Sequence, residues 1–255
     1  MFKSYLKYFF TAKGAHSLHS PFVYQFYTEV MKRSRYFNDS AIREIRKELI
    51  RNKSEIELLD LGAGSRKNTE SKRSVSEIAK VSGIRSKYGR LLARMVEFYQ
   101  LKSSVELGTS LGLGTSYLAL ASFENKVVTL EGAPEVLKIA EANFKKLGLP
   151  NVHTISGNFY DNLEDSLVNG ELLDLVYIDG NHTYQATMDY FNFYLSHTHD
   201  DSFIIIDDIH WSEEMERAWE EILDSPAIHV SMDLFRMGIV CKKSTQAKQH
   251  FVLRF

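Results

Sequence analysis

The amino-acid sequence predicts an α/β fold with a seven-stranded, mostly parallel sheet, helices on both faces and a helical cap at the N-terminus. The stretch from Ser103 to Gly132 reads as a strand, a glycine-rich turn, a helix and a second strand. Three later apolar segments alternate with amphipathic helices and are followed by polar residues. This alternation is typical of a Rossmann-like sheet, whose ligands bind beyond the carboxyl ends of the strands.

The first strand–turn–helix unit has the features that a bound ligand needs. Ser104 to Leu107 is the predicted strand and includes Glu106, and the second strand, Val127 to Leu130, is followed by Glu131. The turn contains Gly108, Gly112 and Gly114. Glycine permits positive φ and a close backbone approach. The helix start near Thr115 offers free N–H groups to an anionic or polar ligand.

The spacing of these glycines indicates which cofactor to expect. The dinucleotide pattern G-x-G-x-x-G fits poorly, because the spacing from Gly108 is G-x-x-x-G-x-G and an acid, Glu106, precedes it. Glu131 follows the next strand, where a carboxylate can accept hydrogen bonds from two neighbouring ribose hydroxyls. The pattern therefore favours a nucleoside-containing cofactor that is not a dinucleotide.

Composition limits the class of protein. Hydrophobic residues make up 44% and charged residues 25% of the chain, as in ordinary globular proteins. No apolar run approaches the roughly 18 residues of a membrane span, and Lys3 and Lys7 interrupt the apolar start, unlike a signal peptide. Cys241 is the single cysteine, which excludes an internal disulfide and a cysteine metal cluster. We expect a cytoplasmic protein.

Charge is distributed unevenly along the chain. Residues 1–100 hold 20 Lys and Arg against 10 Asp and Glu, whereas residues 101–255 hold 11 against 23. A basic front half attracts anions such as a nucleic acid, a membrane surface or an acidic substrate. We favour the simpler interpretation, a solvated helical surface beside an acidic domain. The predicted division is a helical cap with a basic loop over residues 1–100 and a ligand-binding domain over residues 101–255.

The first hundred residues are predicted to be largely helical. One helical face is formed by the apolar residues Phe2, Tyr5, Leu6, Phe9 and Phe10. This face fits packing on the chain's own domain or on a second copy, as in a homodimer through the N-terminal helices, and a membrane-surface helix is the alternative. Further helices are expected over Pro21–Lys32, Asp39–Asn52, Val75–Ala79 and Ser86–Gln100.

A second glycine segment, Glu57 to Ser65, reads E-L-L-D-L-G-A-G-S and resembles the first turn. We do not interpret it as the ligand site, because Arg66 to Ser76 has no apolar period that would pack a helix on a sheet. No strand ending in an acid follows it either. Arg66 to Ser74 is predicted to be a mobile basic loop.

The remaining elements continue the alternation of helix and strand. A helix with an apolar stripe is predicted over Pro134–Leu147, with Gly148 as its C-cap. Later strands are expected at Val152–Ser156, Leu172–Ile178 and Ser202–Ile206, and helices at Thr187–His197 and Ser212–Leu223. A terminal hairpin is expected over Ile228–Leu234 and Met237–Lys242, with one more strand at Phe251–Phe255.

Together these motifs resemble those of the class I S-adenosylmethionine (AdoMet)-dependent methyltransferases, and most closely the catechol-type and related small-molecule O-methyltransferases. The resemblance covers Glu106 to Cys241. It rests on E-L-G-T-S-L-G-L-G in the first turn, E-G after the second strand, G-N-F after the third, Y-I-D-G-N-H after the fourth and I-I-D-D after the fifth. It implies an AdoMet-binding methyltransferase domain over residues 101–255.

The resemblance also implies roles for individual residues. Around the methionine part of AdoMet it places Glu106, Gly108, Thr109, Ser110 and Gly112. At the ribose and adenine it places Glu131, Gly132, Asn158 and Phe159, and Asp179 completes the cofactor-binding set. The family often has an acid where Asn158 stands, but an amide carbonyl oxygen can still accept a hydrogen bond from the adenine amino group.

Two routes to an activated acceptor follow from the same resemblance. Asp179, Asp207 and Asp208 match positions that bind Mg²⁺ in the metal-dependent members, where the third ligand is usually Asn. His182 stands where the family often has a lysine, and a neutral histidine can accept a hydroxyl proton. We favour His182 as the catalytic base, with Asp179 beside it, because Asp208 departs from the metal pattern. Mg²⁺ is then an optional cofactor.

The sequence therefore predicts methyl transfer from AdoMet to a small-molecule hydroxyl acceptor. An RNA or protein methyltransferase is the enzymatic alternative, suggested by the basic front half. No N-P-P-Y-like motif for base methylation follows the fourth strand, so nucleic acid is not the expected partner. A non-catalytic AdoMet-binding protein is the non-enzymatic alternative. His210 and Trp211 are candidates to line the acceptor pocket, although Trp211 fits the core equally well.

Overall fold

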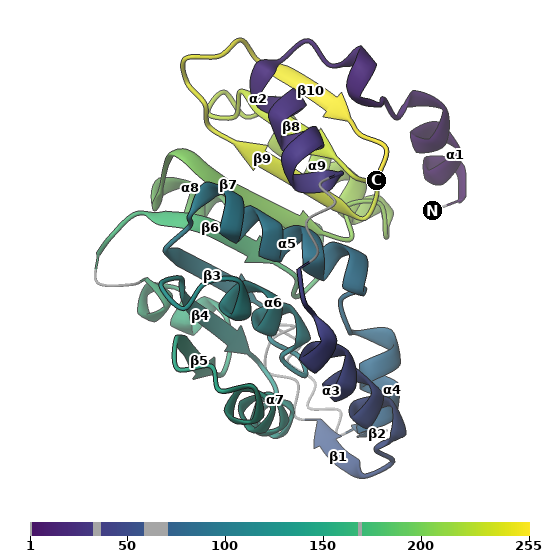
Figure 1. Cartoon of the computed structure of the whole chain (residues 1–255), viewed down its shortest axis with the longest axis vertical. Coiled ribbons are helices and arrows are strands. Elements are labelled where there is room, and N and C mark those ends of the chain that lie inside the picture. Colours follow the sequence, from purple (N-terminus) through teal and green to yellow (C-terminus); the bar gives the residue numbers. More distant parts are fainter. Residues whose placement is uncertain (1, 33–36, 59–70, 168–169) are drawn as a thin grey trace. The chain divides into compact units, whose positions relative to one another are not determined.

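The computed structural model describes residues 2–32, 37–58, 71–167 and 170–255 (Figure 1). These residues form two compact units. The first unit joins Met1–Arg33 to Glu171–Phe255, and the second is Ser34–Gly170. The N-terminal helices thus belong to the same unit as the C-terminal third of the chain. The predicted functional division at residue 100 stays a prediction.

The second unit contains three parallel strands covered by helices. β3 (Ser103–Leu107), β4 (Lys126–Glu131) and β5 (Val152–Ser156) lie in the order β3-β4-β5. β3 is buried along its whole length, as expected for a parallel strand covered on both faces. α6 (Leu113–Ala121) connects β3 to β4, and α7 (Pro134–Leu147) connects β4 to β5 (Figure 1).

Three more helices complete the main part of this unit: α3 (Ser40–Arg51), α4 (Val75–Val81) and α5 (Ser86–Tyr99). α5 packs beside α6, and α3 packs beside α4. Short 3-10 helices lie at Tyr160–Asn162 and Glu164–Ser166.

Asp39, immediately before α3, joins three of these helices through one buried carboxylate. It accepts hydrogen bonds from Arg90 Nη1 at 2.9 Å and from the Tyr117 hydroxyl at 3.0 Å. Its other oxygen lies 3.1 Å from Nε of Arg43. Because Arg90 lies on α5 and Tyr117 on α6, the buried charge is paired and fixes the packing of α3.

A separate hairpin corrects one sequence prediction. β1 (Glu55–Leu58) pairs antiparallel with β2 (Ser71–Ser74). The prediction of a mobile loop is wrong for Ser71–Ser74, because their backbone is paired and Ser74 then forms a capping box with Glu77 at the start of α4. The rest of that loop and most of the second glycine segment, residues 59–70, lie outside the described residues.

The first unit contains five strands in the order β10-β8-β9-β7-β6. β6 (Leu173–Ile178) and β7 (Thr198–Asp207) are parallel, whereas β9 (Met237–Cys241) runs antiparallel to β7 and to β8 (Val230–Asp233). β10 (Gln249–Val252) is parallel to β8. The predicted hairpin and the α/β class with a mostly parallel sheet are confirmed. β10 adds a strand to the seven predicted ones and begins two residues before the segment predicted for it, Phe251–Phe255.

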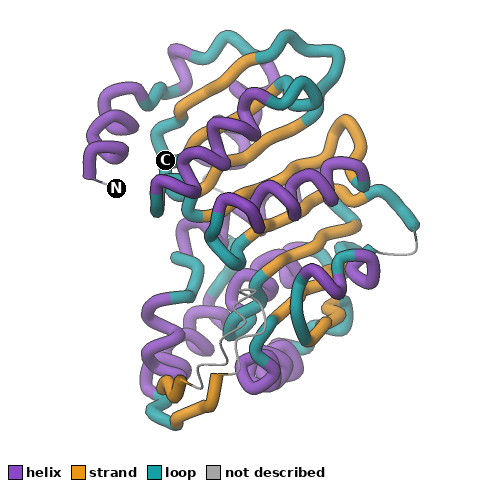
Figure 2. Tube along the Cα trace, turned by 180° about the vertical axis from the view of Figure 1, so that it is seen from behind, coloured by secondary structure: helices purple, strands orange, loops and turns teal. Residues whose placement is uncertain are grey.

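Helices cover the strands of the first unit as well. α8 (Tyr184–Ser196) lies beside α9 (Glu213–Asp224) and packs on β6 and β7 (Figure 2). α2 (Pro21–Gln25) continues as a π-helix over Phe26–Met31, within the single helix that the sequence predicted. A 3-10 turn lies at Ala15–Ser17.

α1 (Phe2–Thr11) is attached to the C-terminal segment of the same unit. The Tyr8 hydroxyl donates to the carbonyl of Leu253 at 2.6 Å. Leu6, Phe9 and Phe10 remain exposed on this helix. None of the helices in the described ranges reaches the length and hydrophobicity that crossing a membrane requires.

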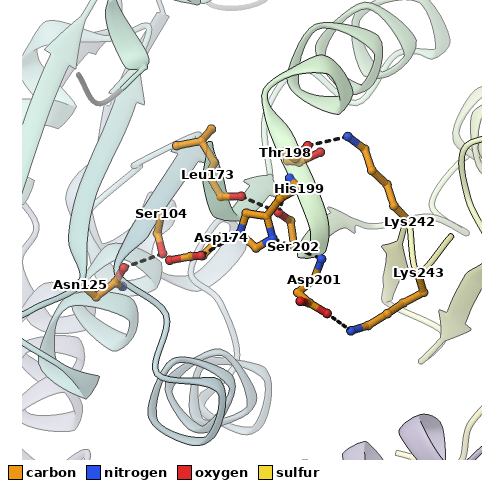
Figure 3. Close-up of polar contacts among 10 residues, drawn as sticks. All are labelled: Ser104, Asn125, Leu173, Asp174, Thr198, His199, Asp201, Ser202, Lys242 and Lys243. Carbon is orange, nitrogen blue, oxygen red and sulfur yellow. Dashed lines mark hydrogen bonds and ion pairs between the residues drawn. The ribbon is translucent and has the colours of Figure 1, made fainter. Parts of the chain in front are cut away.

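Polar contacts secure the amino ends of β6 and β7 (Figure 3). His199 Nε2 lies 2.9 Å from Asp174 Oδ1, and the Ser202 hydroxyl donates to the carbonyl of Leu173 at 2.6 Å. Both contacts join the first half of β7 to the start of β6. The opposite, carboxyl ends of these two strands carry the candidate catalytic residues.

Candidate active site

The glycine-rich turn after β3 has an unusual backbone conformation. Gly108, Ser110 and Gly112 have φ angles of 103°, 47° and 80°. The N–H groups of Gly108 and Thr109 both donate to the carbonyl of Leu130, at 2.9 and 3.0 Å, which ties the turn to the end of β4. Positive φ at the two glycines agrees with the prediction. The positive φ of Ser110 was not predicted, and a residue with a side chain is strained in this left-handed backbone conformation.

Gly112 is required by a neighbouring helix as well as by its backbone angle. A Cβ at this position would lie 2.6 Å from a ring carbon of Phe144 on α7. The carbonyl of Gly112 accepts the Ser116 N–H at 3.0 Å, so α6 begins two residues earlier than predicted. The group that approaches the backbone of Gly112 closely is therefore the Phe144 ring of α7.

Glu106 lies beneath the turn in a buried polar network. Its side chain accepts hydrogen bonds from the hydroxyls of Thr115 and Thr129, the latter at 2.7 Å. The hydroxyls of Thr109 and Thr129 lie 2.7 Å apart and extend the network. Burial raises the pKa of Glu106 from 4.5 to about 7, against the opposing effect of the two threonine donors. A cationic ligand group nearby would favour its ionised form.

Glu131 connects the turn to the end of β5. Its carboxylate accepts the N–H of Ser110 at 2.7 Å and the N–H of Ala133 at 3.0 Å. Its main-chain carbonyl accepts the N–H of Gly157 at 2.9 Å. A carboxylate has about four acceptor positions, and the sequence predicts that Glu131 binds ribose hydroxyls at some of them.

The predicted adenine-binding residues follow directly. Asn158 Oδ1 accepts the Tyr160 N–H at 2.9 Å and so starts the 3-10 helix. Phe159 and Gly132 are buried. The structure thus brings Ser110, Glu131 and the Asn158 segment together in the second unit, and their roles toward a cofactor stay predictions.

Asp179 and His182 follow β6 in the first unit. The Tyr177 hydroxyl donates to Asp179 Oδ2 at 3.1 Å, and His182 Nε2 lies 3.7 Å from Asp179 Oδ1. That separation is too long for a hydrogen bond but short enough for an ion pair once the imidazole is protonated. Asn181 between them has a φ of 51°, in the left-handed region. The predicted pair is therefore in proximity.

Asp207 and Asp208, at the end of β7, face an arginine that the sequence analysis missed. Arg236 Nε lies 3.5 Å from Asp207 Oδ2 and 3.3 Å from Asp208 Oδ1. Asp207 is completely buried, and this burial raises its pKa while Arg236 acts in the opposite direction. Arg236 could have been inferred, because the predicted hairpin leaves only Phe235 and Arg236 in its turn, next to the strand that pairs with β7.

The three aspartates do not fit a Mg²⁺ site in this arrangement. Mg²⁺ requires oxygen ligands in near-octahedral geometry, whereas a guanidinium lies against Asp207 and Asp208. Within the described ranges, no group of three or more His, Cys, Asp or Glu side chains is arranged to hold a metal ion.

His210 lies between two carboxylates and against an aromatic ring. Its ring nitrogens lie 3.2 Å from Glu216 and 2.9 Å from Asp233, and these carboxylates raise the pKa of His210 although burial lowers it. Phe235 stacks on the ring. Trp211 is 60% exposed, so the prediction that it fits the core is wrong.

Comparisons with known proteins agree with this geometry. The model of a methyltransferase domain matches residues 105–209. A search of curated proteins by sequence gave no significant match. Among solved structures, an O-methyltransferase from Bacillus cereus in complex with SAH is similar with a TM-score of 0.61 and 19% identity, covering 82% of this chain and 94% of that one.

Two further solved structures show the same fold. The SAH-bound methyltransferase PaMTH1 from Podospora anserina has a TM-score of 0.56 at 16% identity and covers 83% of this chain and 99% of that one. The O-methyltransferase TomG from Streptomyces achromogenes, in complex with SAM and involved in tomaymycin synthesis, has a TM-score of 0.56 at 17% identity, over 63% of this chain and 82% of that one.

At these identities the likeness shows the fold, which is that of the class I methyltransferases, as the sequence resemblance predicted. Residues 105–209, which include the turn after β3 and Asp207 and Asp208, are matched as a methyltransferase domain. The chain therefore has the fold of the class I methyltransferases, and its residues 105–209 match a methyltransferase domain.

Proposed function

We propose that the protein transfers the methyl group of AdoMet to a hydroxyl oxygen of a small-molecule acceptor. The observation that supports this most strongly is the turn after β3, held by Glu131 and lying over the buried carboxyl of Glu106, within the matched methyltransferase domain. Similar structures described as O-methyltransferases, one in complex with SAM and one with SAH, support the choice of cofactor and of oxygen as the acceptor atom.

The residues of the second unit fit an AdoMet site by their chemistry. Glu106 is a buried acid that a cationic amino group would stabilise in its ionised form. Glu131 is a carboxylate at the end of β4 that can accept hydrogen bonds from ribose hydroxyls, and Asn158 and Phe159 follow the neighbouring strand β5. When bound, AdoMet supplies an electrophilic methyl group on a sulfonium centre.

His182 is the proposed proton acceptor for the acceptor hydroxyl. The imidazole takes the proton as the oxygen becomes the nucleophile. Asp179, 3.7 Å away, then stabilises the imidazolium, and Tyr177 holds the other oxygen of Asp179. Most of the remaining rate enhancement comes from holding the two substrates at reacting distance.

The test begins with an acceptor screen of catechols, phenols and hydroxy acids, with SAH release as the readout. We expect turnover that survives EDTA, and His182→Ala should lower kcat by roughly 10²-fold or more, the scale of general base catalysis. His199→Ala is the matched control, because His199 also pairs with an aspartate but lies at the amino end of β7. Activity that EDTA abolishes and Mg²⁺ restores, with His182→Ala near wild type, would assign activation to Mg²⁺ at the aspartates.

A homodimer through the N-terminal helices and a cytoplasmic location are part of the same proposal. The exposed side chains of Leu6, Phe9 and Phe10 on α1 support the dimer, and the single thiol, Cys241, suits a reducing compartment. Sedimentation velocity of the wild type and of Phe9→Ser tests the dimer. A monomeric wild type would reject it.

A further inference from the structure

Arg236 is placed by backbone pairing next to two of the three predicted metal ligands. β9 runs antiparallel to β7 with Met237 opposite Asp207, so the residue before Met237 lies beside the end of β7. The N–H of Ile209 donates to the carbonyl of Arg236 at 3.3 Å, which joins the β8–β9 turn to the segment after β7. The position of Arg236 is thus set by the sheet.

The guanidinium makes close contacts with both carboxylates. Nε lies 3.5 Å from Asp207 and 3.3 Å from Asp208, and Nη2 donates to Asp208 Oδ2 at 3.4 Å. The Arg236 side chain is 25% exposed and that of Asp207 is completely buried. A counter-charge stabilises a buried carboxylate, and the positive charge of Arg236 lies within ion-pair distance of Asp207.

The backbone around this contact is in a conformation that side chains rarely adopt. Asp208 has a φ of 53° and Phe235, next to Arg236, has a φ of 69°. The N–H of Phe235 donates to Asp233 Oδ1 at 2.6 Å, which supports the turn. Such conformations persist only where the surrounding structure fixes them, and they concentrate at functional sites.

We propose that Arg236 takes the place of the divalent cation, so that the aspartates after β6 and β7 form a metal-free site held by a guanidinium. Arg236 is a positioning residue: it fixes Asp207 and Asp208, while His182, with Asp179 beside it, accepts the proton. The proposal rests on the proposed function for the role of His182. Whether the cluster binds a metal is measured without acceptor or turnover, so the two can fail separately.

The test is Mn²⁺ binding, followed by the electron paramagnetic resonance signal of free Mn²⁺, for wild type, Arg236→Met and Arg236→Gln. We expect the wild type to bind no Mn²⁺ up to about 1 mM, the weak end of protein cation sites. Both variants should bind one Mn²⁺ per chain, and adding Asp207→Asn should abolish it. Arg217→Met is the control, because Arg217 stacks on Tyr184 in the same unit.

Two results would overturn the proposal. Wild-type protein that binds Mn²⁺ in a way that Asp207→Asn removes would show that the cluster holds a metal despite Arg236. Folded Arg236 variants that bind no Mn²⁺ would show that the guanidinium does not stand in for a cation. If both variants fail to fold by circular dichroism, the titration of the wild type and of Asp207→Asn decides on its own.

Discussion

Glu106 illustrates how one residue combines a structural and a chemical role. The sequence places an acid two residues before the first glycine, and the structure buries it with Thr115 and Thr129 as donors. In the ligand-free protein, burial favours the protonated carboxyl, and a cation near the turn would reverse this. The same group therefore costs stability in the free protein when ionised and favours a positively charged ligand.

This argument predicts a pH dependence of stability. The pKa of Glu106 is raised to about 7 in the folded state, so protonation of this carboxyl stabilises the fold. This stabilisation is fully present below about pH 4.5 and is lost as pH rises through about 7. The loss should reach about 3 kcal/mol in the free energy of unfolding. Urea unfolding between pH 5 and pH 8 should show it in wild type and not in Glu106→Gln. Equal pH slopes in the two proteins would reject the buried acid, and the exposed Glu124→Gln serves as control.

Glu131 carries the prediction on cofactor affinity. Glu131→Ala removes a carboxylate that binds ribose hydroxyls and should weaken SAH binding by about 1.5–3 kcal/mol, the range for hydrogen bonds to charged groups. Glu131→Gln should lose less, because the amide oxygen can still accept the N–H of Ser110. Isothermal titration calorimetry measures both, with Asp60→Ala as control. A larger loss for Asp60→Ala would mean that the second glycine segment is the cofactor turn.

Residue-scale prediction from the sequence succeeded where local spacing carries the information. Glu131 and the glycines of the turn lie together, as the strand–turn–helix pattern requires. Arg236 was missed because its importance depends on which strand lies beside β7, a long-range pairing. The positive φ of Ser110 was also missed; its N–H donates to Glu131, a contact between residues 21 positions apart.

At the scale of elements, α6 and α7 depend on the absence of a side chain at Gly112. Its φ of 80° excludes most residues, and Phe144 occupies the space that a Cβ would need. Gly148, the C-cap of α7, has a similar φ of 65° but no atom within 4 Å of its Cβ position. A side chain at Gly148 would therefore meet only backbone strain, whereas a side chain at Gly112 would meet backbone strain and a clash with Phe144.

We predict different costs for the two alanine substitutions. Gly148→Ala should lower the free energy of unfolding by about 1–2 kcal/mol, the cost of a left-handed conformation. Gly112→Ala should cost about 1–3 kcal/mol more, because Phe144 must move. Chemical denaturation of both variants gives the difference. Equal costs would show that α7 does not constrain the turn.

Element boundaries could be predicted where the ends carry their own signals. α7 matches its prediction at both ends, since Pro134 suits the first helical position and Gly148 the C-cap. β2 was missed because its sequence, S-K-R-S, has no apolar alternation and forms a strand only through pairing with β1. The π-helix after α2 could not be distinguished from an α-helix by a search for apolar residues at a 3.6-residue period.

For the whole molecule, the fold class could be predicted from the order of strands and helices, because that order is local information. The grouping into units could not, since Met1–Arg33 joins Glu171–Phe255 through contacts between the two ends of the chain. Tyr8 with Leu253 is one such contact. The methyltransferase assignment depends mainly on residues 105–209, which the family model also matches.

Ligand binding to the whole chain, measured by calorimetry and by thermal unfolding, tests the central claim most directly. AdoMet and SAH should each bind once per chain and raise the melting temperature, because a ligand that binds only the folded state stabilises it by mass action. NADH should do neither, since the glycine spacing after Glu106 is not that of a dinucleotide site. Binding of NADH without binding of AdoMet or SAH would contradict the account.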